Sequence, residues 1–257
     1  MDCGPVHRRR GDRPRRTTRR DGPPSTIDQR SRIMTNFVLV PGMCHGGWCF
    51  EPLTRRLRDL GHTVHPLTLT GVSERRHLLH GTVNLDTHIQ DVIAVLEDED
   101  VRETVLVGHS YGGMVITGVA DRAPDRVDSL VYLDAVVPGD GDSCWSLVSD
   151  QERRWYADVD ETGCASRPLP FFDARATPHP VASVLQRLRL TGALAHVRRR
   201  DYVYAAGWAD QSPFTPTYRK LNNDPGWTTH ALAGGHNLMR DTPDQLARIL
   251  LDVAASR

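Results

Sequence analysis

The residue that most clearly indicates catalytic chemistry is a serine with a glycine two positions before it and another glycine two positions after it. Ser110 lies between Gly108 and Gly112, directly after an apolar run and directly before a helical pattern. A sharp turn from strand to helix needs small residues at these positions, because the backbone there is strained and crowded. Such a turn raises the hydroxyl above the sheet, at the positive end of the following helix, where an oxyanion can be stabilised. The spacing therefore predicts Ser110 as a nucleophile.

A serine hydroxyl attacks efficiently only when a base takes its proton, and histidine is the usual base. Of the 12 histidines, His236 lies between the last predicted strand and the last predicted helix, and we predict it as the base. We expect His109, which precedes the serine, to pack beneath the turn. Eight other histidines lack this placement, and surface or core positions suit most of them: His45, His62, His65, His77, His80, His88, His179 and His230.

The elements that would position these residues follow from the hydrophobic pattern. Continuous apolar runs without polar alternation are typical of parallel strands that are covered on both faces. An amphipathic helix is predicted around residues 85–96, and the last helix is predicted to begin with a capping box at Thr242–Gln245, with Pro243 in its first turn. Strands that alternate with helices predict an α/β fold around a mostly parallel sheet with helices on both faces. The predicted strands are Phe37–Val40, Thr63–Leu69, Thr104–Val107, Leu130–Leu133, Tyr202–Ala206 and Thr228–Leu232.

Two segments interrupt the alternation. Residues about 138–200 lack a clear strand, and we interpret them as a mainly helical cap insertion over the active-site face, with an irregular peripheral subdomain as the alternative. Its aromatic residues are predicted to bind substrate: Trp145, Trp155, Phe171 and Phe172. Residues 1–33 hold ten arginines against four aspartates and almost no large apolar side chains. We predict a disordered Arg-rich tail, with a non-native extension upstream of Met34 as the simplest origin.

Composition limits the function classes. The 257 residues are 39% hydrophobic, the formal net charge is zero, and no apolar run approaches the roughly 18 residues of a membrane span. Five cysteines without CxxC spacing argue against a disulfide framework or a zinc site and favour a reducing, cytoplasmic location. Neither a metal-ligand spacing nor a dinucleotide-binding motif is present, so we expect no cofactor and no metal. We also expect no nucleic-acid or membrane partner, and a homodimer stays an open alternative.

From Phe37 onward the chain resembles the α/β-hydrolase superfamily, and within it the branch of plant-type methylesterases and hydroxynitrile lyases with their bacterial esterase relatives. The resemblance implies an oxyanion hole made by the backbone N–H groups of Met43 and Tyr111. Pro41-Gly42 stands where the family usually has His-Gly, and this change leaves the backbone role intact. The segments that carry the resemblance are Val38–Trp48, Gly108–Gly113 and the pair Gly226-Trp227-Thr228 and Gly234-Gly235-His236.

The triad acid has two candidates. Asp134 ends an apolar strand, where a buried carboxylate is costly unless it is paired, and His236 is a fitting partner. The resemblance implies an acid after the next strand, where Asp210 stands at a spacing slightly longer than in the plant enzymes. We favour Asp134 and keep Asp210 as the alternative, and a structural role for both stays open.

The predicted function is hydrolysis of a small, apolar or aromatic carboxylic ester or thioester through a Ser-His-Asp triad and an acyl-enzyme. A serine at the elbow argues against epoxide hydrolases and haloalkane dehalogenases, which need a carboxylate there. Hydroxynitrile lyases of the resembled branch carry a lysine directly after the catalytic histidine, where this chain has Asn237. Two alternatives remain on the same scaffold, a non-hydrolytic biosynthetic catalyst such as a cyclase or decarboxylase, and a ligand-binding pseudo-hydrolase.

Overall fold

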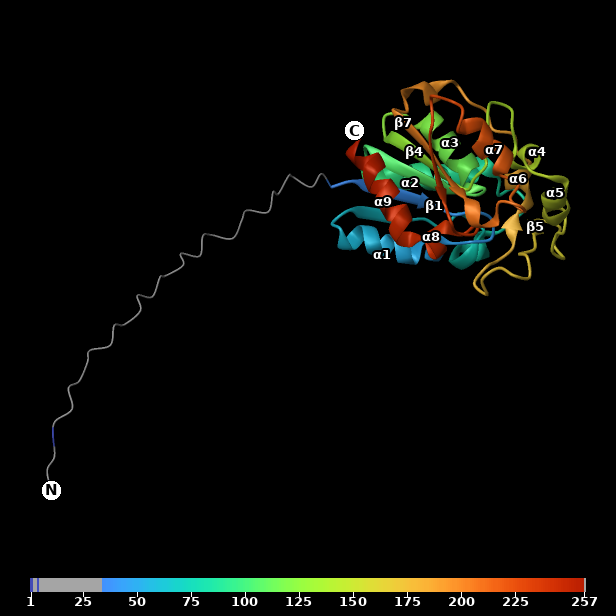
Figure 1. Cartoon of the computed structure of the whole chain (residues 1–257). Coiled ribbons are helices and arrows are strands. Elements are labelled where there is room, and N and C mark those ends of the chain that lie inside the picture. Colours follow the sequence, from blue (N-terminus) through green and yellow to red (C-terminus); the bar gives the residue numbers. More distant parts are fainter. Residues whose placement is uncertain (2–3, 5–33, 257) are drawn as a thin grey trace. The chain divides into compact units, whose positions relative to one another are not determined.

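A six-stranded parallel sheet forms the centre of the fold, with strand order β2-β1-β3-β4-β7-β8 (Figure 1). The computed structural model describes Met1, Gly4 and residues 34–256, so the predicted disordered tail lies outside the described residues apart from those two. The α/β fold with a parallel sheet is as predicted. The strands are β1 (Asn36–Val40), β2 (Thr63–Pro66), β3 (Thr104–His109), β4 (Val127–Leu133), β7 (Arg199–Ala205) and β8 (Thr228–Leu232).

Alternate side chains of each central strand enter two separate apolar layers. Val38, Val40 and Leu106 pack on one face with α2 (Leu85–Asp98) and α3 (Gly112–Arg122). Phe37 and Val105 pack on the other face with α1 (Glu51–Asp59) and α9 (Pro243–Ala255). Every residue of β3 and β4 is buried, which explains why these strands show continuous apolar runs rather than alternation.

Two predictions about helices have different outcomes: the apolar face of α2 is confirmed, and the capping box of α9 is not. In α2, the predicted apolar face is buried, and Asn84 and Thr87 form a capping box at its start. In α9, Pro243 occupies the first turn as predicted, but the capping box at Thr242 is wrong. A short helix, α8 (Leu238–Asp241), ends immediately before Thr242, and the Thr242 hydroxyl donates to the Leu238 carbonyl oxygen at 3.2 Å. The side chain therefore serves the end of α8 instead of the start of α9.

The predicted cap insertion lies between β4 and β7, and Figure 1 shows its helices together at one end of the sheet. Its helices are short, and among them lies a two-stranded antiparallel sheet that the sequence did not predict, since strands of two residues show no periodicity. Several of its apolar side chains join the core layer that contains α2 and α3. Its elements are α4 (Cys144–Leu147), α5 (Asp150–Tyr156), β5 (Ala165–Ser166), β6 (His179–Pro180), α6 (Val181–Leu185) and the 3-10 helix η3 (Ala193–His196).

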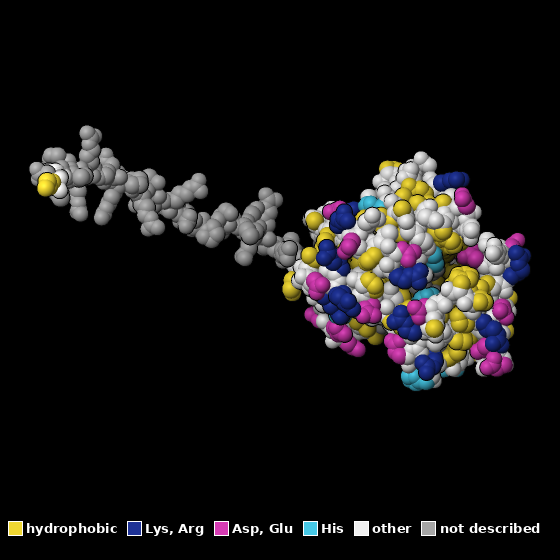
Figure 2. All heavy atoms as spheres, turned by 60° about the horizontal axis from the view of Figure 1, so that its bottom comes forward, with side chains coloured by type: hydrophobic (Ala, Val, Ile, Leu, Met, Phe, Trp, Pro, Cys, Tyr) yellow, Lys and Arg dark blue, Asp and Glu magenta, His cyan; other side chains and the backbone are white. Residues whose placement is uncertain are grey.

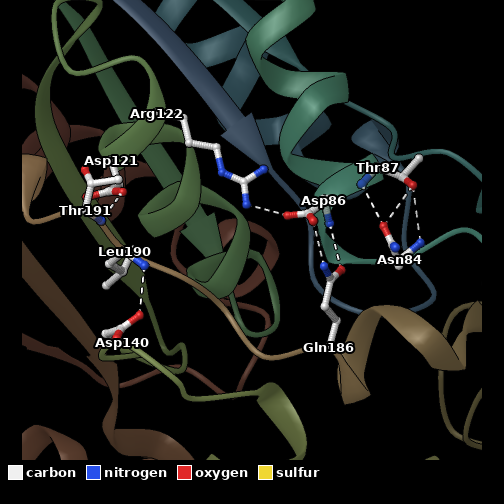
Figure 3. Close-up of polar contacts among 9 residues, drawn as sticks. All are labelled: Asn84, Asp86, Thr87, Asp121, Arg122, Asp140, Gln186, Leu190 and Thr191. Atoms are coloured by element: carbon white, nitrogen blue, oxygen red, sulfur yellow. Dashed lines mark hydrogen bonds and ion pairs between the residues drawn. The ribbon is translucent and has the colours of Figure 1, made fainter.

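Polar contacts fasten this insertion to α2 and α3 (Figure 3). Asp121, buried near the end of α3, accepts the backbone N–H of Thr191 at 2.7 Å. The Asp86 carboxylate of α2 accepts the side-chain amide of Gln186 at 2.7 Å and also pairs with Arg122. The insertion is therefore held to the helices of one face at two separate points. The remaining described helices are α7 (Thr215–Leu221), η1 (Gly47–Phe50), η2 (Ser73–Leu78) and η4 (Ala206–Trp208).

Candidate active site

Ser110 occupies the turn from β3 to α3, as the sequence predicts. Its φ of 53° lies in the left-handed region, which is uncommon for a residue with a side chain. The turn is closed by hydrogen bonds from the Ser110 N–H to the Leu133 carbonyl and from the Gly113 N–H to the Ser110 carbonyl. A Cβ atom on Gly108 would lie 2.6 Å from the Gly112 carbonyl oxygen, so a larger residue would force this turn open. The half-buried Ser110 side chain therefore sits at the start of α3 on a tightly constrained backbone.

Asp134 follows β4, which lies beside β3 in the sheet, and the structure brings it to His236. The Asp134 Oδ2 atom accepts a hydrogen bond from His236 Nδ1 at 2.8 Å, and the carboxylate is completely buried. It also accepts the Trp208 indole N–H at 3.0 Å on Oδ2 and the Ala205 backbone N–H at 3.2 Å on Oδ1. Three donors thus compensate the burial of one carboxylate, which would otherwise be very costly.

Asp210, the alternative acid, is exposed on the segment that follows η4. Among the described residues, the carboxylate hydrogen-bonded to His236 is Asp134 and not Asp210. Trp208, two residues before Asp210, contributes to the pair instead, because its indole reaches Asp134 and its ring centroid lies 5.0 Å from that of His236. The Trp208 contact was not predicted from the sequence.

His236 lies between β8 and α8, and its loop is tied to the elbow. The ring of His109, the residue before Ser110, lies 4.4 Å from the His236 ring, and His109 Nε2 donates to the His236 carbonyl oxygen at 3.0 Å. Burial lowers the pKa of His109 well below its ordinary value, and the nearby His236 lowers it further. His109 is therefore a neutral donor, and its packing beneath the turn stays a prediction. Its contact with His236 is an additional finding.

The loop after β1 passes directly over the elbow. A Cβ atom on Gly42 would lie 2.9 Å from the Ser110 Cβ atom, so the two segments are in contact. Met43 and Tyr111, whose N–H groups are the predicted oxyanion donors, are both buried beside this contact. Within the loop, His45 Nδ1 donates to the Met43 carbonyl oxygen at 2.7 Å, and burial lowers the pKa of His45. His45 is buried in this loop, which agrees with the core position that the sequence allowed.

Backbone strain is concentrated around these residues. Among the described residues other than glycine, six have a positive φ, and three of them are Cys44, Ser110 and Asp134 at 66°, 53° and 42°. Each such residue costs about 1–3 kcal/mol and persists only where its surroundings hold it. All three lie just beyond the carboxyl ends of neighbouring strands, β1, β3 and β4. This edge of an open α/β sheet is where ligands usually bind.

The predicted substrate-binding aromatics differ in their surroundings. Phe172 packs against His45 and Trp155, with ring centroids 5.1 and 5.4 Å away, and Trp145 is also partly buried against the core. Phe171 is 80% exposed and packs edge-on against Phe172. Phe172 and Trp155 therefore connect the cap to the loop that crosses the elbow.

A small pocket of about 120 Å³ adjoins this aromatic group. Its lining includes His45, Trp48 and Asn237, the residue after His236, together with charged side chains such as Arg175 and Arg240. Figure 2 shows histidine side chains at the surface between hydrophobic side chains and basic ones. In residues 34–256, the structure contains no group of three or more side chains suited to hold a metal ion, and no helix long and apolar enough to cross a membrane.

Comparison with known proteins agrees with this architecture. Residues 37–249 match the model of the Alpha/beta hydrolase family. The chain is 41% identical over 239 residues to the carbendazim hydrolyzing esterase of Nocardioides sp. (strain SG-4G), with 84% of this chain and 98% of that protein covered. It is 34% identical over 114 residues to Methylesterase 10 of Arabidopsis thaliana, which covers 44% of this chain and 42% of that protein.

Solved structures show the same fold. An extracellular alpha/beta-hydrolase from a Paenibacillus species aligns with a TM-score of 0.71 at 21% identity, over 85% of this chain and 98% of that one. A methylesterase from Arabidopsis aligns with a TM-score of 0.67 at 21% identity, over 87% and 100%. The chain therefore belongs to the α/β hydrolase family. Within it, the chain is an enzyme of the carboxylesterase type, as the resemblance implied.

Proposed function

We propose that Ser110, His236 and Asp134 form a catalytic triad that hydrolyses a small-molecule carboxylic ester through an acyl-enzyme. The observation that carries this proposal is the 2.8 Å hydrogen bond between His236 Nδ1 and the fully buried Asp134 carboxylate. A carboxylate can only accept, so the proton of the neutral imidazole is held on Nδ1 and Nε2 is left as a base. A serine nucleophile requires a neutral imidazole with a free Nε2 atom to take its proton. The hydrogen bond from His109 to the His236 carbonyl oxygen links this imidazole's loop to the elbow.

In this mechanism, the Ser110 oxygen attacks the ester carbonyl carbon while its proton passes to His236 Nε2. The tetrahedral oxyanion is stabilised by the N–H groups of Met43 and Tyr111 and by the start of α3. The same proton then goes to the departing alkoxide, which leaves as the alcohol, and the acyl group stays on Ser110. Water repeats these steps, giving the carboxylic acid and the free serine. Asp134 keeps its negative charge throughout and stabilises the imidazolium.

The surroundings favour a small substrate with an apolar or aromatic group. Phe172 and Trp155 of the cap form an aromatic group with His45, which also lines the small pocket beside Asn237. Aromatic rings prefer such edge-on or offset neighbours, which add to the free energy of burying apolar surface. The relative named for carbendazim hydrolysis makes carbendazim a substrate to test beside simple aryl and methyl esters.

The test is turnover of p-nitrophenyl acetate, methyl benzoate and carbendazim by the wild type and by Ser110→Ala. We expect turnover by the wild type and a loss of about 10⁴-fold or more in Ser110→Ala. Ser129→Ala is a matched control, because it removes a buried hydroxyl from β4 that bonds to Asp128. Its kcat should stay within about threefold of the wild type. A wild type that binds these esters without cleaving them would refute the proposal and favour a ligand-binding pseudo-hydrolase.

A further inference from the structure

The turn that carries the oxyanion donor Met43 is held by the cap insertion, through a residue far away in sequence. His179, on β6, is completely buried, and its Nδ1 atom accepts the backbone N–H of Cys44 at 3.3 Å. Two residues earlier, the backbone N–H of Thr177 donates to the Cys44 carbonyl oxygen at 3.0 Å. Both polar backbone groups of Cys44 are thus satisfied by one short segment of the insertion.

Cys44 needs such support, because its φ of 66° is unfavourable for a residue with a Cβ atom. The peptide group between Met43 and Cys44 is fixed from both sides. Its carbonyl oxygen accepts His45 Nδ1 at 2.7 Å, and its N–H donates to His179 Nδ1. Rotation of this peptide would change ψ of Met43 and φ of Cys44, so the path of the turn, and with it the position of Met43, depends on these two hydrogen bonds.

The partners of His179 determine which of its nitrogens carries the proton. The Cys44 N–H can only donate, so Nδ1 must present a lone pair, and the proton lies on Nε2. Nε2 then donates to the Ser183 hydroxyl at 3.0 Å, and that hydroxyl donates to the Pro180 carbonyl at 2.7 Å. Burial holds the pKa of His179 well below its ordinary value, which is consistent with a neutral ring.

We infer that His179 is a positioning residue that fixes the oxyanion turn through the Cys44 N–H and thereby sets the rate of acyl transfer. The inference rests on the proposed function, in which Met43 stabilises the oxyanion. A donor displaced by about 1 Å loses most of its effect in the transition state, while ground-state binding changes little. Loss of the acceptor should therefore lower kcat and leave KM nearly unchanged.

Two amide substitutions at the same buried position separate this role from packing. In His179→Asn, the amide oxygen lies at the level of Nδ1 and can still accept the Cys44 N–H. In His179→Gln, the amide lies one carbon further out, at the level of Nε2, and leaves Cys44 without its acceptor. For p-nitrophenyl acetate, we expect kcat within about fivefold of the wild type for His179→Asn and about 10²-fold lower for His179→Gln, with KM within about twofold for both.

A second readout does not depend on activity. Amide hydrogen exchange of Cys44, followed by nitrogen-15 NMR, should stay slow in His179→Asn and become at least about tenfold faster in His179→Gln. Equal kcat values in the two variants, or unchanged exchange in His179→Gln, would overturn the inference. A wild type without esterase activity would refute the proposed function and with it the catalytic part of this inference. The exchange data would still show whether His179 holds the Cys44 N–H.

Discussion

Replacing Asp134 by asparagine tests the assignment of the acid with almost no change in shape. The carboxylate has three donors around it, with His236 and Trp208 on Oδ2 and Ala205 on Oδ1. An asparagine has only one oxygen, so its NH₂ group must face at least one of these donors. If the oxygen stays near His236, the Ala205 N–H loses its acceptor. If the amide is reversed, its NH₂ group faces His236 and favours the tautomer with the proton on Nε2.

The second arrangement satisfies the imidazole but removes the base, since Nε2 can then no longer take the Ser110 proton. In a Ser-His-Asp protease, this wrong tautomer costs about 10⁴-fold in kcat. The same loss here corresponds to about 5 kcal/mol of activation free energy. An unsatisfied buried donor would also lower the free energy of unfolding by about 1–3 kcal/mol.

The assay compares kcat for p-nitrophenyl acetate in Asp134→Asn and Asp210→Asn, with thermal melts followed by circular dichroism. Asp210 is exposed, so we expect its variant to keep kcat within about twofold and the same melting temperature. We expect Asp134→Asn to remain folded and to lose about 10⁴-fold. An active Asp134→Asn beside an inactive Asp210→Asn would refute the assignment.

Two further predictions concern stability. Burial lowers the pKa of His88 to about 4, so the folded state binds fewer protons than the unfolded chain between about pH 6.5 and 4. Burying the neutral ring contributes about 3 kcal/mol to the free energy of unfolding. This contribution is fully present above pH 6.5 and is lost as the pH falls towards 4. In His88→Gln, the midpoint of urea unfolding should therefore fall less steeply as the pH is lowered. His196→Gln, at an exposed position, should keep the pH dependence of the wild type. The same pH dependence of the urea midpoint in both variants would contradict this assignment. Asn84→Ala should lower the free energy of unfolding by about 1 kcal/mol, because α2 loses its cap. Thr242→Ala should lower it clearly less, because the Thr242 side chain does not cap α9. The reverse order in urea unfolding would contradict this capping pattern.

The parts of the fold that local patterns specify could be predicted from the sequence. The strands β1 and β3 and the turn at Ser110 follow from apolar runs and glycine spacing, which are properties of neighbouring residues. The starts of β4 and β7 were placed too late, because polar residues stand there. In β7 these residues are paired, since Arg199 binds the fully buried Asp201 carboxylate through two hydrogen bonds of 2.7 and 2.8 Å.

The candidate site could be predicted where glycine spacing, element order or the cost of burying a charge gives a local signal. A carboxylate that ends a buried strand requires a partner, and this argument favoured Asp134 once His236 had been predicted from its place between the last strand and the last helix. The contacts of Trp208 and His179 carry no such local signal. Trp208 reaches Asp134 across 74 residues of sequence, and His179 reaches Cys44 across 135. Both depend on how the strand ends and the insertion are arranged in space, which no periodicity encodes.

The most direct test of the central claim is to identify the residue that becomes covalently modified. The wild type and Ser110→Ala are treated with a fluorophosphonate, digested, and mapped by tandem mass spectrometry. A triad centred on Ser110 predicts one stoichiometric phosphonyl adduct on the peptide that contains Ser110, parallel loss of esterase activity, and no adduct in Ser110→Ala. An adduct on another residue, or undiminished labelling of Ser110→Ala, would contradict the account.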